Sequence, residues 1–235
     1  MFSETTKRPP LIPLVIILFC TIAAFHIGGA LIGRTASRFD HLGAALEYAH
    51  RPINLLRPVI LGANATGTPT ALELPLWQAT VGMVFKVTHS TWFGWASLVS
   101  LLFFASALWP FRQLGKRYIG ARAADWALVF LLAQPLIIFE AGQASVDAFC
   151  LALTIWFLFF ADKMISSGNA WWWLPTAWFA CLSAVTKPPF FMAAGLFGIF
   201  LLLNNRARSW RSWILLAGAG VRGADALRRL APRPR

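Results

Sequence analysis

Long apolar stretches separated by short polar segments dominate the chain. The first runs from about Leu11 to Gly33 and follows Lys7 and Arg8; it is too long for the core of a signal peptide. Five more cover approximately 92–111, 123–139, 148–161, 171–186 and 190–203. Because about 20 apolar residues in a helix cross a bilayer, the pattern predicts an all-α, polytopic transmembrane helix bundle with about six full spans.

Two regions depart from this pattern. Residues 34–91 are mixed in polarity, and we expect them to form a helical extracytoplasmic first loop. A seventh apolar stretch begins at Trp213 but stops after about nine residues, too few to cross a bilayer. The sequence thus divides into a transmembrane region, 1–212, and an aborted span with a basic Arg/Pro/Ala tail, 213–235. The tail is typical of a segment resting on anionic lipid; we favour a truncation within a longer protein.

Composition and charge support the membrane assignment. Only 13% of the residues are charged, against about 25% in ordinary soluble domains. The net charge of +12 comes largely from Lys and Arg that flank the predicted spans, which is typical of cytoplasmic loops. We therefore expect a cytoplasmic N-terminus, no nucleic-acid partner and, from the Ala/Arg-rich composition without eukaryotic retention signals, the bacterial inner membrane. The three cysteines, all in apolar stretches, indicate core packing.

The acidic side chains gather on the predicted outside face. Glu47 is interpreted as a solvated loop residue, whereas Asp40 and Glu73 are candidates for function because an ionised carboxylate beside apolar segments is costly. The other polar candidates on this face are Arg38, His41, Arg57, Glu140, Asp147 and Lys187. This collection suggests a wet, charged cavity at the membrane surface. Transfer of a sugar from a lipid phosphate to a hydroxyl would need such groups, a general base and a positive charge for the leaving phosphate.

Four stretches resemble the GT-C superfamily of integral membrane glycosyltransferases, which includes the protein O-mannosyltransferases and related bacterial enzymes. They are SRFDHLGAAL, LELPLWQ, QPLIIFEAGQASVDAFCLAL and LSAVTKPPF. Their order matches over about residues 10–205. The chain departs from the family in two respects: Asp40 is followed by His41 where the family often has two adjacent acids, and the later spans of the family are absent.

The resemblance implies a polyprenyl-phosphate-linked sugar as donor and an inverting displacement onto a hydroxyl of a glycan, lipid or protein acceptor. Asp40 would be the catalytic base, and Glu73 would orient the acceptor or help to hold a divalent metal. The implied substrate-binding residues are Arg38, His41, Arg57, Glu140, Asp147 and Lys187. No metal ligands are assigned, because the sequence has no His/Cys metal spacing.

Two alternatives stay open. The protein could be a non-enzymatic membrane protein, such as a lipid-sugar carrier, a flippase component or a scaffold. It could also be an inactive truncated product. The sequence shows no clear internal repeat, and its acids lie near one surface, which favours a glycosyltransferase over a transporter.

Overall fold

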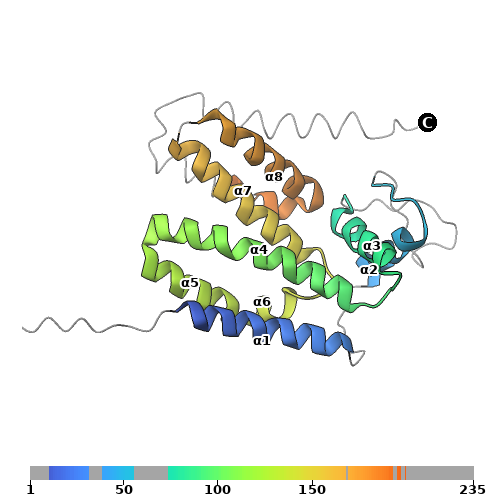
Figure 1. Cartoon of the computed structure of the whole chain (residues 1–235). Helices are drawn as coiled ribbons and strands as arrows, with labels where there is room; N and C mark the ends of the chain where they lie inside the picture. Colours follow the sequence, from blue (N-terminus) through green and yellow to red (C-terminus); the bar gives the residue numbers. More distant parts are fainter. Residues whose placement is uncertain are drawn as a thin grey trace, which may run out of the picture.

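In the computed structural model the described residues are 11–31, 39–55, 74–167, 169–192, 195, 196 and 199. They form helices joined by short connections, with no strand among them (Figure 1). The helices are α1 (Ile12–Leu31), α2 (Phe39–His50), α3 (Leu76–Thr88), α4 (Gly94–Ile119), α5 (Ala121–Ala133), α6 (Pro135–Glu140), α7 (Asp147–Ser167), the 3-10 helix η1 (Ala170–Trp172) and α8 (Trp173–Thr186).

Three of these helices, α1, α4 and α7, are long and apolar enough to cross a membrane, and α8 is a shorter apolar helix. The structure therefore confirms the helical, membrane-type class, but the described residues contain three full-length spans where the sequence predicts more. The predicted sixth span lies mostly outside the described residues. The seventh stretch and the tail, 213–235, lie wholly outside them.

The predicted third span is not one helix. It is divided into α5 and α6 at Gln134, whose extended backbone (φ −69°, ψ 129°) separates the two. The cause is Pro135, which has no backbone N–H to continue the helix and disfavours helical geometry in the residue before it.

The predicted second span is longer than the apolar pattern suggests. Helix α4 continues through Arg112, Lys116 and Arg117, which the sequence analysis placed in a loop, and ends at Ile119. Lys and Arg are good helix formers, and their charges are favourable near a helix C-terminus. Gly120, with φ +83°, then takes a conformation that favours glycine and turns the chain into α5.

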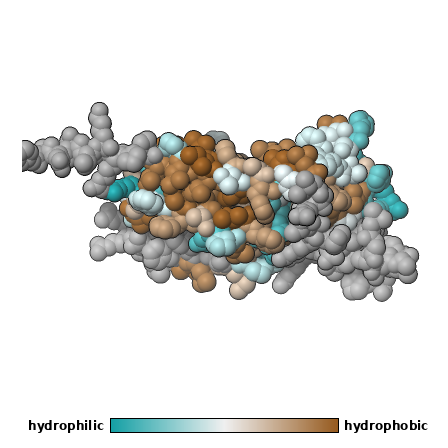
Figure 2. Space-filling model, turned by 90° about the horizontal axis from the view of Figure 1, so that it is seen from below, coloured by the Kyte–Doolittle hydropathy of each residue, from teal (hydrophilic) through white to brown (hydrophobic). Residues whose placement is uncertain are grey.

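Helix α4 packs against α7, which packs against α8, while α1 lies against α4 and α5 (Figure 1). Apolar side chains of α1 such as Ile16, Ile17 and Phe25 are exposed. Hydrophobic residues cover much of the molecular face on the α1 side (Figure 2). An apolar exposed face of this kind fits contact with lipid.

The two ends of the bundle differ in construction. At one end the short helices α2 and α3 pack together beside the starts of α4 and α7 and the end of α8; we call this the α2–α3 end (Figure 1). At the other, α4 and α7 end and α5 and α8 begin. We call the segments 109–126 and 156–173 the basic end.

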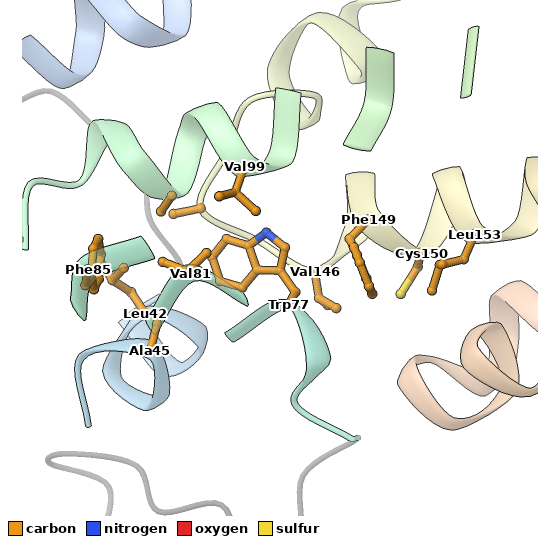
Figure 3. Packing of buried hydrophobic residues seen from close by; sticks show 12 residues of the cluster. Leu42, Ala45, Trp77, Val81, Phe85, Val99, Val146, Phe149, Cys150 and Leu153 are labelled. Atoms are coloured by element: carbon orange, nitrogen blue, oxygen red, sulfur yellow. The ribbon is translucent and has the colours of Figure 1, made fainter. Parts of the chain in front are cut away.

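The core of the α2–α3 end is built around Trp77 of α3, which is fully buried. Its ring lies among side chains from α3, α4 and the start of α7, including Val81, Val99 and Val146 (Figure 3). Its indole N–H donates a hydrogen bond of 3.0 Å to Ser100 Oγ, so the polar edge is satisfied inside an apolar core. One residue thus joins the α2–α3 pair to the long helices.

Candidate functional site

A buried, irregular segment connects α6 to α7 at the α2–α3 end. Residues 141–146 have no regular helix, yet all six are buried. Local hydrogen bonds satisfy part of this backbone: Gln143 N–H donates to Glu140 O (3.2 Å) and Ser145 N–H to Gln143 O (2.8 Å). Ser145 Oγ also donates to Glu140 Oε2 at 3.3 Å. The sequence pattern predicts a short outside turn here; the structure shows a turn whose residues are buried, because the surrounding helices cover it.

Asp147 and Lys187, both predicted as substrate-binding residues, form an ion pair. Asp147 is the first residue of α7, where the helix dipole favours a negative charge, and Lys187 directly follows α8. Their side chains are 16% and 22% exposed, so the pair is reachable from outside without being fully solvated. The structure thus brings together two groups that lie 40 positions apart in the chain.

The start of α3 is attached beside this pair. Leu74 donates its backbone N–H to the carbonyl of Val185 at 3.0 Å, two residues before Lys187. Leu74 is the residue that follows Glu73 in the sequence. Glu73 itself lies outside the described residues, as do Arg38 and Arg57.

Helix α2 carries Asp40 and His41 in its first turn, so His41 is helical rather than a loop residue. The Nδ1 atom of His41 lies 3.0 Å from Nε2 of Gln78, a buried side chain of α3. This contact fixes the start of α2 against α3. The backbone of Asp40 is described, and its side chain lies outside the described part.

Glu47 of α2 is buried rather than solvated, which contradicts the expectation from the sequence. It pairs with Arg51, one helical turn later, at 2.6 Å. The cause is the close contact of α2 with α3, where a Cβ on Gly82 would lie 2.6 Å from Cβ of Tyr48. Tyr48 is buried in the same contact and donates to Asn54 O at 2.9 Å; burial raises the pKa of its phenol.

His26 of α1 is a further polar contact at this end that the sequence analysis missed. Its Nε2 lies 2.8 Å from the carbonyl oxygen of Ile138, in α6. The ring packs so closely on the buried segment that a Cβ on Gly142 would lie 2.4 Å from His26 Cγ. A lone histidine inside an apolar stretch was the available signal.

The basic end holds a cavity of about 770 Å³ between α4 and α7, which the sequence analysis also missed. Aromatic and charged side chains both line it. The lining residues are Trp109, Gln113, Lys116, Arg117, Trp156, Phe159, Phe160, Asp162, Lys163 and Trp172. The signal was the presence of tryptophans about two turns before cations on both helices.

Chemically, the α2–α3 end offers a partly exposed lysine held by a carboxylate, and a second carboxylate, Glu140, at the start of the buried segment. A lysine fixed in this way can bind a phosphate oxygen. Within the described residues, no group of three or more His, Cys, Asp or Glu side chains is placed to hold a metal ion.

Comparisons of this chain with protein families, with curated proteins and with solved structures find no match. Any function must therefore be argued from the chain's own residues.

Proposed function

We propose that the protein is a membrane glycosyltransferase, or the N-terminal part of one, that works at the α2–α3 end. It transfers a sugar from a polyprenyl-phosphate donor to a hydroxyl on the extracytoplasmic side. The observation that carries the proposal is the Asp147–Lys187 ion pair beside the start of α3.

Lys187 is the phosphate-binding group in this proposal. An ammonium already held by Asp147 needs little reorganisation to donate a hydrogen bond to a phosphate oxygen, and it stabilises negative charge as polyprenyl phosphate leaves. Its position directly after the apolar helix α8 suits a ligand whose phosphate lies at a membrane surface and whose chain lies in lipid.

Asp40 is the proposed general base for the acceptor hydroxyl. Its backbone lies in the first turn of α2, and the neighbouring His41 is fixed against Gln78 of α3. Glu73 precedes Leu74, whose amide is bonded to Val185 at the end of α8. The bond from Leu74 supports a role for Glu73 near Lys187, where it would orient the acceptor, and the contact of His41 attaches the start of α2 to the same α3 helix.

The test uses the full 235-residue chain in lipid vesicles, polyprenyl phosphate carrying a radiolabelled hexose, and lipid, glycan and peptide acceptors. Asp40→Asn should lower transfer by about 10² or more, since a general base contributes 10²–10⁴-fold. Glu73→Gln should also lower it. Asp125→Asn, which removes a carboxylate at the basic end, is the matched control and should leave the rate unchanged.

Lys187→Gln should chiefly weaken donor binding, and Lys86→Gln, an exposed lysine of the same end, is its control. Undiminished transfer in both Asp40→Asn and Glu73→Gln would overturn the site assignment. Donor binding that needs Lys187, without transfer to any acceptor, would support the carrier alternative. Transfer only by a longer in-frame chain would identify the 235-residue protein as an inactive truncated product.

A further inference from the structure

Along α4 and α7, the lining of the cavity at the basic end changes from aromatic to positively charged residues. On α4 the order is Trp109, Gln113 and then Lys116, so the aromatic ring lies further into the helix than the cation. On α7 the order is the same, with Trp156 before Phe159 and then Lys163. Because α4 and α7 both run from the α2–α3 end towards the basic end, the two gradients point in the same direction (Figure 1).

The positive charge of this lining is only partly neutralised. Asp162, a buried carboxylate, accepts a hydrogen bond from Tyr118 Oη at 2.5 Å and pairs with Arg117 at 3.3 Å. Within the described part of the chain, Lys116 and Lys163 have no carboxylate partner. Lys163 instead places its ammonium 5.7 Å from the ring centre of Phe159. Two cations without a carboxylate partner among the described residues thus line a cavity that is otherwise rich in aromatic rings.

We propose that this cavity binds one anionic phospholipid, with its phosphate at Lys116 and Lys163 and an acyl chain along the aromatic wall. The site is separate from the proposed donor site, which lies at the opposite end. Its place suits such a ligand: α4 and α7 are long enough to cross a bilayer, and Trp171, next to the cavity-lining Trp172 in the chain, is exposed, as tryptophans at a membrane surface commonly are.

The two-part lining favours a lipid over a free anion. A small phosphate ion would use the cations but would leave the aromatic wall without a ligand. A zwitterionic lipid would use the wall, but its own positive group would offset its attraction to the two lysines. An anionic phospholipid matches both parts at once.

The test is native mass spectrometry of the detergent-purified, delipidated full chain with dioleoyl phosphatidylglycerol or dioleoyl phosphatidylcholine at equal concentrations. We expect one tightly retained phosphatidylglycerol and weaker retention of phosphatidylcholine. Lys116→Gln and Lys163→Gln should each weaken phosphatidylglycerol binding about fivefold, the typical contribution of one lysine near a lipid surface. Arg122→Gln is the matched control, because Arg122 is an exposed cation of the same end outside this cavity.

The chain contact can be read separately with phosphatidylglycerol brominated on its acyl chains, which should quench tryptophan fluorescence in the unaltered protein more than in Lys163→Gln. Equal retention of the two lipids would overturn the proposal. So would an equal loss of binding in Arg122→Gln and Lys163→Gln, which would indicate surface charge alone. Full displacement of the lipid by millimolar inorganic phosphate would also overturn it, in favour of a free-phosphate site. None of these readouts depends on glycosyl transfer.

Discussion

Helix α7 carries one carboxylate towards each end of the bundle, and the two are stabilised differently. Asp147 is the first residue of α7, so the helix dipole itself supports its charge, and its partner Lys187 is partly exposed. Asp162 lies in the C-terminal half of α7, where the dipole gives no support, and it is almost fully buried. It therefore depends on Arg117 and Tyr118 of α4.

The two ion pairs therefore differ in the free energy that it costs to break them. Breaking the Asp147–Lys187 pair costs less, because Asp147 keeps its favourable position at the start of α7. Arg117 cannot leave Asp162 without stranding a buried charge. We infer that the lysines around Asp162, rather than Arg117, are available to a ligand at the basic end.

The ends also differ in charge and in backbone. The basic end has five cations and two carboxylates within its helical segments 109–126 and 156–173. The α2–α3 end encloses an irregular buried segment, 141–146, in which local hydrogen bonds satisfy part of the backbone and the side-chain nitrogen of Gln143 is buried without a partner. The first arrangement attracts anions from solution or lipid, whereas the second depends on tight packing.

The largest effect should come from breaking that packing with Trp77→Ala. Removing a fully buried tryptophan and stranding Ser100 should lower the free energy of unfolding by about 3–5 kcal/mol. The measurement is unfolding in detergent micelles with a chemical denaturant. Trp171→Ala at the basic end, where the ring is 81% exposed, is the control and should change stability by about 0.5 kcal/mol or less. Similar losses of stability in the two variants would contradict the inference that the α2–α3 end depends on tight packing around Trp77.

A smaller effect should follow Gly142→Ala, which places a methyl group against the ring of His26. Overpacking of this kind costs about 1–3 kcal/mol, and His26→Ala in the same chain should recover part of it by making room. Gly28→Ala, where an added Cβ meets nothing within 4 Å, is the control.

Gly115→Ala tests the loss of stability caused by overpacking at the basic end. The new Cβ would lie 2.8 Å from Cβ of Ala124, so it would press α4 and α5 apart. The contact is with Ala124 alone, so Ala124→Gly should recover part of the lost stability, and the remaining loss reflects the backbone of Ala124 at 3.2 Å. Thermal unfolding of the single and double variants measures both cycles; rescue of Gly142→Ala by Ala124→Gly would refute this account.

The smallest expected difference concerns the two ion pairs. Arg117→Gln should cost about 2 kcal/mol because Asp162 stays buried, whereas Lys187→Gln should cost about 1 kcal/mol because the helix dipole still supports Asp147. Both values allow for the partial exposure of the cations, which weakens an ion pair. Denaturant unfolding of the two variants side by side shows which loses more stability. A larger loss in Lys187→Gln than in Arg117→Gln would contradict this account of the two ion pairs.

Parts of the fold followed directly from the sequence. The first apolar stretch was predicted at 11–33 and is observed as Ile12–Leu31, because length and hydrophobicity alone define such a helix. The helical content of the first loop is confirmed where the structure describes it, in α2 and α3. Among the candidate residues, the structure brings Asp147 and Lys187 together as an ion pair, while their place on the outside face stays a prediction.

Other features, such as helix ends and the burial of polar side chains, could not be predicted from the apolar pattern. The apolar pattern ends the second span near residue 111, but the charged residues that follow do not end the helix, because Lys116 and Arg117 extend it favourably. The burial of Glu47 depends on how α2 meets α3, and the role of His26 depends on Gly142, more than a hundred positions away. Such contacts depend on how distant segments pack together, and local hydropathy carries no information about that packing.

The sequence by itself determined that this chain is helical and apolar enough for a membrane, since backbone hydrogen bonding and hydrophobic length are local properties. It also determined which charges are available, but not their partners. Tertiary packing alone decided that α7 supports one carboxylate by its dipole and the other by the end of α4. It also buried residues 141–146 and left two lysines at an aromatic cavity, because burial and pairing depend on which surfaces the folded chain brings together.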